Sequence, residues 1–247
     1  MNLANKIVFV TGGSQGIGLA IAEALLDEGS RVVICGRNTE GLAQAKAANP
    51  HLHTIRCDIT QESELLVALA EIEAEYGGLD ILVNNAGVQF NYRHPKESKT
   101  TNIISRIEQE IELNFTSVVK LTQHALPLLM RSREGAIVNV GSGTGLVPKP
   151  DGIVYSATKA AIHSFTKGLR WQLEETNVKV FELFPPVVET AMTAGRPGEK
   201  MQSSVVAQQL ISGMKRDQTE ITVGKIKLLR LINRLSPALA ETIMRRQ

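Results

Sequence analysis

The stretch Thr11-Gly12-Gly13-Ser14-Gln15-Gly16-Ile17-Gly18 follows a short apolar run, Ile7–Val10, and opens a helical pattern, Ile17–Glu28. Glycines in this place let backbone amides approach a pyrophosphate at a helix N-terminus, where the helix dipole favours anions. Gly12, Gly16 and Gly18 give the spacing G-x-x-x-G-x-G, against the commoner G-x-G-x-x-G. A tight turn alone would also use glycines, but the strand before and the helix after them favour a dinucleotide site.

Apolar runs alternate with helical patterns along the rest of the chain. The further expected strands are Arg31–Cys35, Leu52–Cys57, Ile81–Val83, Ala136–Val140, Lys179–Phe184 and Glu220–Val223. The further expected helices are Glu40–Ala48, Ser63–Tyr76, Ile103–Leu129, Ala157–Leu173 and Val205–Lys215. Strands that are apolar throughout and separated by helices indicate a parallel sheet covered on both faces. We therefore predict an α/β fold with a doubly wound parallel seven-stranded sheet, a Rossmann fold, in one domain over residues 1–224, with an extension over residues 225–247.

The composition is that of an ordinary globular chain. Its 247 residues suffice for one sizeable core, and 43% of them are hydrophobic. A net charge of +2 argues against a nucleic acid as partner. Cys35 and Cys57 have neither metal-ligand nor redox-pair spacing, so we predict no metal site and read them as reduced, buried thiols of a cytoplasmic protein. We expect neither a signal peptide nor a membrane span, since no run approaches the ~20 apolar residues that a span needs.

Residues at the ends of the next strands extend the predicted dinucleotide site. An NAD site has Asp or Glu after the second strand, where this chain has Gly36-Arg37-Asn38. Arg37 can fork onto a 2′-phosphate, which favours NADP(H) over the alternative of a solvated loop arginine. Asp58, after the third strand, either accepts a hydrogen bond from an adenine amino group or serves as a turn or N-cap residue. Asn84-Asn85-Ala86-Gly87 closes the fourth strand, at the sheet edge where open α/β sheets bind ligands.

Tyr155 and Lys159 are the candidate catalytic pair. They lie four residues apart where a loop rich in Gly and Pro enters an expected helix, so their side chains share a face. A cation ~4 Å from a phenol, at an effective dielectric constant of ~20, contributes roughly 4 kcal/mol, or about 3 pK units, toward phenolate. This predicts a lowered pKa for Tyr155, in the range that a general acid–base needs. Alone, the pair would favour the simpler interpretation of a solvated helix surface.

Taken together, the motifs resemble the short-chain dehydrogenase/reductase family, in its short single-domain branch. The resemblance rests on Thr11-Gly12-x-x-x-Gly16-x-Gly18, Asn84-Asn85-Ala86-Gly87, Asn114, Ser142 and Tyr155-x-x-x-Lys159, in family order over residues ~5 to ~224. It implies that Tyr155 exchanges a proton with the substrate oxygen and that Lys159 lowers the Tyr155 pKa and holds the nicotinamide ribose. It further implies that Ser142 hydrogen-bonds the substrate carbonyl and that Asn114 holds a water linking Lys159 to solvent. Without the resemblance, Ser142 reads as a turn residue and Asn114 as a polar kink in a helix.

The expected cofactor-binding residues come from the glycine turn, the strand ends and the catalytic helix. They are Gly12, Ser14, Gln15, Gly16, Ile17, Gly18, Arg37, Asp58, Ile59, Asn85, Ala86, Gly87, Tyr155, Lys159, Pro185, Val188 and Thr190.

One loop departs from the family pattern. After the sixth strand the family usually has Pro-Gly, and this chain has Pro185-Pro186-Val187-Val188-Glu189-Thr190. Since proline fixes φ and has no N–H, we expect an extended loop and an altered substrate pocket, with Thr190 still near the cofactor carboxamide. Candidate pocket walls, which are also compatible with ordinary core positions, are Phe90, Tyr92, Leu146, Val147 and Val187.

The predicted function is an oxidoreductase that transfers hydride between NADP(H) and a small-to-medium, partly apolar carbonyl or alcohol. Sugar-nucleotide epimerases and dehydratases share the glycine turn and the Tyr/Lys pair, but they need a substantial C-terminal substrate domain for which this chain is short. A non-catalytic NADPH-binding regulator is the alternative from another class, and loss of a catalytic residue would favour it. In the family, helices in the places of Leu113–Leu129 and Ala157–Leu173 pair subunits, which implies a homodimer or homotetramer.

The tail beyond the last strand is basic and amphipathic. Residues 215–247 hold eight Lys or Arg against three acidic residues. The expected basic face of a helix here has Lys227, Arg230 and Arg234, and the expected apolar face has Leu228, Leu231, Ile232 and Leu235. Ser236-Pro237 predicts the N-cap and first residue of a second helix, Ala238 to about Arg245. The favoured interpretation is a helix docked on its own domain with the basic face in water; the alternatives are a wall of the substrate entrance and a loose, peripheral contact with anionic membranes.

Overall fold

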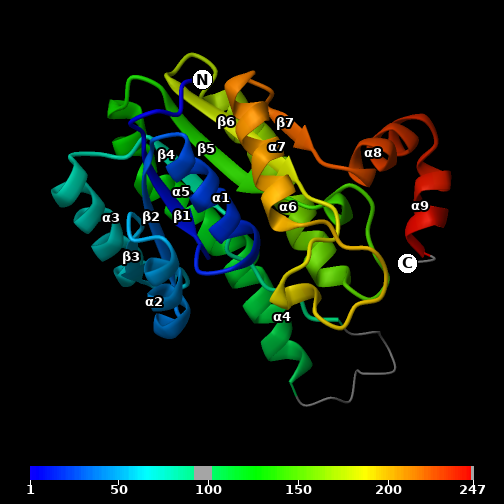
Figure 1. Cartoon of the computed structure of the whole chain (residues 1–247). Helices are drawn as coiled ribbons and strands as arrows, with labels where there is room; N and C mark the ends of the chain where they lie inside the picture. Colours follow the sequence, from blue (N-terminus) through cyan, green and yellow to red (C-terminus); the bar gives the residue numbers. More distant parts are fainter. Residues whose placement is uncertain (92–101, 246–247) are drawn as a thin grey trace.

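The computed structural model describes residues 1–91 and 102–245 (Figure 1). Within these residues a seven-stranded, wholly parallel sheet has the order β3-β2-β1-β4-β5-β6-β7. The strands are β1 (Ile7–Thr11), β2 (Arg31–Gly36), β3 (His53–Arg56), β4 (Ile81–Asn84), β5 (Gly135–Val140), β6 (Val178–Phe184) and β7 (Glu220–Thr222). The predicted doubly wound sheet is confirmed.

Helices cover both faces of this sheet. They are α1 (Gly16–Asp27), α2 (Thr39–Ala48), α3 (Glu62–Tyr76), α4 (Ile103–Ile111), α5 (Ser117–Arg131), α6 (Ile153–Gln172), α7 (Ser203–Lys215), α8 (Lys225–Leu235) and α9 (Pro237–Arg245). None of the helices in the described ranges combines the length and the apolar run that crossing a membrane requires.

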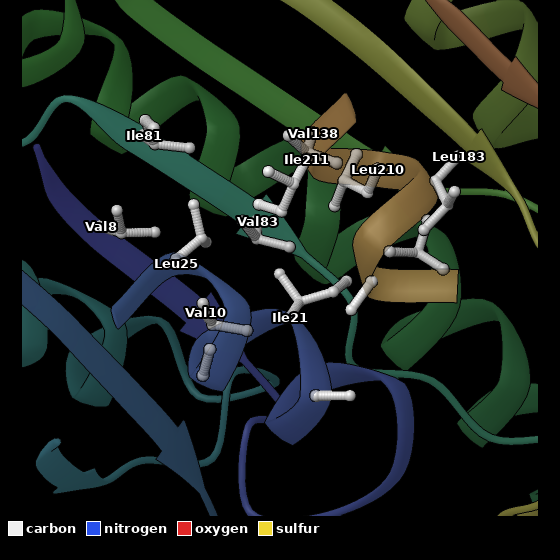
Figure 2. Close-up of a cluster of buried hydrophobic side chains, with 14 of the residues drawn as sticks. Val8, Val10, Ile21, Leu25, Ile81, Val83, Val138, Leu183, Leu210 and Ile211 are labelled. Carbon is white, nitrogen blue, oxygen red and sulfur yellow. The ribbon is translucent and has the colours of Figure 1, made fainter. Parts of the chain in front are cut away.

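Successive strand residues point into two separate apolar layers, because side chains alternate across a strand. Val8 and Val10 of β1 join Ile21 and Leu25 of α1 in one layer, which α2 and α7 complete (Figure 2). Phe9, between those two valines, belongs to the other layer, with side chains of α3, α5 and α6. Burial on both faces explains why the strands are apolar throughout.

The strand order reverses between β1 and β4. From β1 the chain builds outward to β2 and β3, and it then returns to the other side of β1 for β4 to β7. In such sheets ligands bind at the carboxyl ends of the strands, at the place where the order reverses. The glycine turn after β1 and Asn85 after β4 both lie at this place.

Two predicted helices differ from the structure by more than one or two residues at an end. The expected helix Ile103–Leu129 is divided into α4 and α5 by a π-helical turn, Glu112–Thr116. The expected helix Ala157–Leu173 begins earlier, at Ile153, so Tyr155 lies in its first turn and not in the loop before it. Ser156 closes this first turn by donating from both N and Oγ to the Gly152 carbonyl oxygen, at 2.8 and 2.7 Å. The Gly- and Pro-rich composition concealed that turn.

The C-terminal helices α8 and α9 pack against each other beside β7 (Figure 1). Helix α9 begins at Pro237, which confirms the predicted second helix. The helices dock through a small apolar cluster, Val147, Leu229, Ala240 and Met244. The predicted apolar face of α8 is wrong in most of its members, since Leu228, Leu231 and Leu235 are 60%, 54% and 76% exposed. Helix α8 carries two apolar stripes, and the one that includes Leu229 packs against Val147 and α9.

Candidate active site

The glycine turn has a conformation that requires glycine at two positions. Gly12 and Gly16 have φ of 62° and 58°, in the left-handed region that other residues rarely adopt. Gly18 has a different reason, because a Cβ there would lie 2.3 Å from the Gly12 carbonyl oxygen. Gly18 therefore lets α1 pack closely against the turn. The first amides of α1 have no intrahelical partner and are donors for an anion.

Asn85 fastens the turn to the end of β4. Its Nδ2 donates to the carbonyl oxygens of Thr11 and Gly12, at 3.0 and 3.1 Å. In return, Thr11 Oγ1 accepts from the backbone N–H groups of Asn85 and Ala86, at 3.0 and 3.1 Å. These four bonds fix the two sides of the topological switch point relative to each other.

A groove of about 310 Å³ runs along the carboxyl ends of the strands, from Arg37 to Lys159. It brings together these predicted cofactor residues: Gly12, Ser14, Gln15, Gly16, Ile17, Arg37, Asp58, Ile59, Asn85, Ala86, Gly87, Tyr155, Lys159, Pro185 and Thr190. Two predicted members lie outside its lining. Gly18 is under the turn, and Val188 is buried in the core and faces a neighbouring cavity.

Arg37 and Asp58 lie near each other at one end of the groove. Their closest nitrogen and oxygen, Arg37 Nη1 and Asp58 Oδ2, are 3.9 Å apart, and the Arg37 side chain is 65% exposed. Asp58 Oδ1 accepts from the N–H and the hydroxyl of Thr60, at 3.0 and 2.8 Å. Asp58 thus has the turn role left open by its sequence, while its Oδ2 faces Arg37. Most donors of the exposed guanidinium stay free for a ligand.

The two cysteines also line this groove, and they are neighbours in space. Both are free and buried, as expected. Their hydrogen bond, together with burial, raises the pKa of the Cys35 thiol. The same hydrogen bond lowers the pKa of Cys57. Their spacing in the sequence did not indicate that the two thiols are neighbours, because adjacent strands β2 and β3 bring together residues that are far apart in the chain.

The four candidate catalytic residues come from three elements. Lys159 Nζ donates to the Val140 carbonyl oxygen, at 2.8 Å, and lies 5.7 Å from the centre of the Tyr155 ring. Ser142 Oγ accepts from the N–H and Oγ1 of Thr144, at 3.2 and 3.0 Å. Ser142 lies with Tyr155 on one cavity wall.

Asn114 lies in the π-helical turn and is buried. Its Oδ1 accepts from Val88 N and its Nδ2 donates to Val88 O, both at 2.8 Å. Its Nδ2 also lies 3.3 Å from Thr158 Oγ1, on the helix that carries Tyr155. The π-helical turn thus lets the Asn114 side chain contact both the loop after β4 and α6.

The Tyr155 pKa moves in the direction opposite to the predicted one. Burial raises it to about 12, and the interaction with the Ser142 hydroxyl opposes this only in part. Burial also lowers the pKa of Lys159 to about 8. The helical spacing alone suggested a close phenol–ammonium pair. In the fold the ammonium is directed to the Val140 carbonyl, and exclusion of water dominates both side chains.

Sequence reasoning missed a buried acid behind Lys159. Glu182 on β6 is fully buried, and its Oε2 lies 2.8 Å from His163 Nδ1, one helical turn beyond Lys159 on α6. Burial raises the Glu182 pKa; His163 and Arg170 act against the rise, and Glu220 adds to it. The negative charge of Glu182 favours the protonated form of Lys159. The only signal in the sequence was an acidic residue within an apolar strand.

A second cavity of about 360 Å³ adjoins the groove. Both are lined by Ile17, Tyr155, Pro185, Thr190 and Met192. The outer wall is apolar and comes from α8 and α9, through Ile226, Leu228, Leu229, Ile232, Ile243 and Met244. The tail thus lines this cavity, which is the geometry that its interpretation as a wall of a substrate entrance requires.

Only some of the residues predicted to form pocket walls line the second cavity. Val187 lines the second cavity, as does Pro186 in the departing loop. Leu146 and Val147 instead pack against α8 and α9. Phe90 lies outside the lining, with the Arg106 guanidinium 5.6 Å from its ring centre. Tyr92 lies outside the described residues.

Comparison with known proteins agrees with this geometry. The sequence profile of the family described as short chain dehydrogenase matches residues 6–200. Among curated relatives, the uncharacterized oxidoreductase DltE of Bacillus subtilis is 39% identical over 236 residues, which are 93% of this chain and 92% of the relative. An uncharacterized oxidoreductase of Staphylococcus aureus is 32% identical over 234 residues, 91% of this chain and 99% of the relative. The chain belongs to the short-chain dehydrogenase/reductase family.

Solved structures show the same fold. A short chain dehydrogenase from Burkholderia cenocepacia in complex with NADP has a TM-score of 0.85 at 24% identity, covering 99% of each chain. One from Burkholderia phymatum in complex with NAD has a TM-score of 0.84 at 20% identity, covering 95% of this chain and 96% of that one. The family match and the curated relatives make the protein an oxidoreductase, and these two structures are of short chain dehydrogenases bound to NADP and to NAD.

Proposed function

We propose that this protein is an NADP(H)-dependent dehydrogenase/reductase that acts on a carbonyl or alcohol group in the second cavity, with Tyr155 as general acid/base. One observation carries the proposal. Of the described residues that line both the dinucleotide groove and the second cavity, Tyr155 is the one with a titratable side chain. A proton carrier at that junction can reach a substrate oxygen that faces the nicotinamide.

The groove suits a dinucleotide. The left-handed glycines and the start of α1 offer backbone donors to a pyrophosphate, and Asn85 holds this turn in place. A Cβ at Gly16 would come within 3.0 Å of Thr190 Cγ2, so the groove needs a bare backbone here. When bound, the nicotinamide supplies or accepts the hydride.

Proton transfer to and from the substrate oxygen is carried out by Tyr155. A phenol with a pKa of about 12 is protonated at neutral pH, so Tyr155 donates its proton to a carbonyl oxygen that gains charge during reduction. In the reverse direction the phenolate takes the alcohol proton. Ser142, on the same wall, orients the substrate oxygen by donating its hydroxyl. Lys159 holds the ribose.

The test is a screen of carbonyls and alcohols with NADPH or NADP⁺ by absorbance, followed by Tyr155→Phe on any active substrate. We expect kcat to fall by about 10²- to 10⁴-fold, with NADPH affinity nearly unchanged, because the phenol moves the proton and touches the cofactor only peripherally. Lys159→Ala should impair both. Retention of most activity by Tyr155→Phe would contradict the mechanism. NADPH binding without turnover of any substrate would favour a regulator.

The preference for NADP(H) rests on the exposed Arg37 and on the lack of an acidic residue directly after β2. Guanidinium groups bind phosphate bidentately, whereas a ribose hydroxyl needs a hydrogen-bond acceptor.

We also propose that the protein is cytoplasmic and forms a homodimer or homotetramer. The exposed Trp171 of α6 and Met130 of α5, at 70% and 51%, support association through these helices, and the molar mass in solution checks it.

We also propose that residues 1–224 form the dinucleotide-binding domain and that residues 225–247 form an extension of it. Helix α8 begins at Lys225, and α9 contributes Ile243 and Met244 to the second cavity. We therefore assign the tail a place in the substrate site.

A further inference from the structure

The charged side chains in the lining of the second cavity are basic. Among the described residues that line it, the charged ones are Lys149, Arg196 and Lys225, and none is Asp or Glu. Two of these cations have acidic partners outside the lining. Lys149 Nζ lies 3.3 Å from Asp151, and Lys225 Nζ lies 3.6 Å from Glu199.

Arg196 differs from the other two. Its Nη2 donates to the neutral Gln89 Oε1, at 2.9 Å, and no carboxylate in the described part of the chain pairs with it. Arg196 is half-buried, and its positive charge acts to lower the pKa of the Tyr155 phenol. An arginine that is partly removed from water and lacks a counter-ion is a costly arrangement unless a ligand supplies the charge.

The loop that carries Arg196 is fixed at its base. Met201 N donates to Val187 O, and Glu189 N donates to Met201 O, both at 2.9 Å. Within the loop, Arg196 N donates to Thr193 O, at 3.1 Å. The backbone therefore presents the guanidinium to the cavity from a defined position.

We propose that the substrate is an aliphatic oxo- or hydroxycarboxylate, whose carboxylate binds Arg196 while its chain lies against α8 and α9. The reaction at the oxo or hydroxyl group rests on the proposed function, whereas the binding of the carboxylate to Arg196 does not. One unpaired cation beside a neutral amide matches a single negative charge, which favours a carboxylate over a phosphate dianion. The apolar side chains of Ile226, Leu229 and Ile232 match an aliphatic chain.

The first experiment needs no turnover. Octanoate and 1-octanol are titrated by calorimetry into the NADPH-bound protein. We expect octanoate to bind about 10- to 100-fold more tightly, the usual contribution of a charge-assisted hydrogen bond. Affinity should rise about fourfold for each CH₂ added from butanoate to octanoate. Equal binding of acid and alcohol by the wild-type protein would overturn the inference.

Variants then assign the charge. Arg196→Gln should abolish the preference for octanoate, and Arg196→Lys should restore part of it. Lys149→Gln is the matched comparison, because Lys149 lines the same cavity but already has Asp151. Loss of the preference in Lys149→Gln and not in Arg196→Gln would refute the assignment to Arg196. If Arg196→Gln does not fold, Arg196→Lys and the wild-type comparison still decide.

The second experiment uses turnover. Hydroxyalkanoates with different spacings between hydroxyl and carboxylate are compared with their methyl esters, using NADP⁺. We expect a KM about 10- to 100-fold lower for the best acid than for its ester, and Arg196→Gln should raise the KM of the acid alone. Turnover that favours the esters would overturn the inference while leaving the proposed oxidoreductase intact. Tight octanoate binding with no turnover of any compound would instead support the inference and contradict the proposed function.

Discussion

The buried charge of Lys159 lowers the free energy of unfolding at neutral pH. Its ammonium is buried, and its pKa falls to about 8 from an ordinary 10.5. A lysine whose pKa is lower in the folded chain contributes fully to stability only above pH 10.5, and this contribution is lost as pH falls through 8. At neutral pH the protein therefore bears the cost of a buried charge, in return for a cation beside Tyr155.

Lys159→Met should therefore stabilise the protein while it destroys activity. The shifted pKa corresponds to about 3 kcal/mol at pH 7, and loss of the bond to Val140 offsets about 1 kcal/mol of it. We expect the free energy of unfolding to rise by about 1–3 kcal/mol at pH 7, with the difference shrinking as pH rises from 8 toward 10.5. Urea titrations across this range measure it, with Lys167→Met, exposed on the same helix, as control. A less stable Lys159→Met variant at pH 7 would show that burying the charge costs less than the bond to Val140 and the packing around the side chain contribute.

Arg37 decides the cofactor in the proposed function. We expect the wild-type protein to bind NADPH roughly ten- to hundredfold more tightly than NADH, because a charge-assisted contact with the 2′-phosphate contributes ~1.5–3 kcal/mol. Arg37→Asp should invert this order, since it removes the cation and offers an acceptor to the ribose hydroxyl. Fluorescence titration with both cofactors measures it, and Arg56→Asp, an exposed arginine outside the groove lining, is the control. Equal or tighter NADH binding by the wild type would refute the assignment.

At the scale of elements, a network of charged side chains joins β6 and α6 next to Lys159. Glu182 on β6 meets His163 on α6, and Glu220 on the adjacent β7 is its register partner. Glu220 in turn pairs with Arg170 of α6, at 3.8 Å, and with Arg230 of α8. The network thus joins the helix that carries Tyr155 to α8, which lines the second cavity.

Glu182 should make stability depend on pH. Its pKa is raised above 4.5 in the folded chain, so its contribution is full below pH 4.5 and is lost as pH rises through the folded-state value. Glu182→Gln resembles the protonated acid. We therefore expect the stability of Glu182→Gln relative to wild type to increase as pH rises from 4.5 to neutral. Urea unfolding at a series of pH values tests this, with Glu174→Gln on the surface as control. A difference that stays constant over the series would rule it out.

At the scale of the whole molecule, α8 presents leucines to solvent. Leu231 and Leu235 are exposed beside Lys227 and Arg234, two cations with no acidic partner in residues 1–91 and 102–245. Apolar side chains flanked by free cations are typical of a surface that contacts anionic lipid. Since α8 and α9 also line the second cavity, such contact would bring this cavity close to the membrane.

We expect the protein to sediment with vesicles of phosphatidylglycerol and phosphatidylcholine at low salt, and not with phosphatidylcholine alone. The double variant Leu231→Gln/Leu235→Gln should reduce the bound fraction, because it removes the exposed apolar stripe without touching the buried Leu229. Leu66→Gln/Val67→Gln, at exposed apolar positions of α3, is the matched control. The membrane contact is discarded if wild type and double variant sediment alike.

The sequence by itself determined the sheet, the place of the dinucleotide groove and the residues that line most of it. These follow from local signals: apolar runs of strand length, glycines between a strand and a helix, and side chains four residues apart. Parallel strands then bring their carboxyl ends to one edge, so residues such as Arg37 and Asn85 meet without further information.

Only the tertiary structure decided how these residues behave. Burial reversed the predicted direction of the Tyr155 pKa, and neighbouring strands joined Cys35 to Cys57. Packing against Val147 and α9 buries one apolar stripe of α8, and the loop held by Met201 places Arg196 in the cavity lining. Solvation, pairing and orientation depend on atoms from segments far apart in the chain, and no local pattern carries that information.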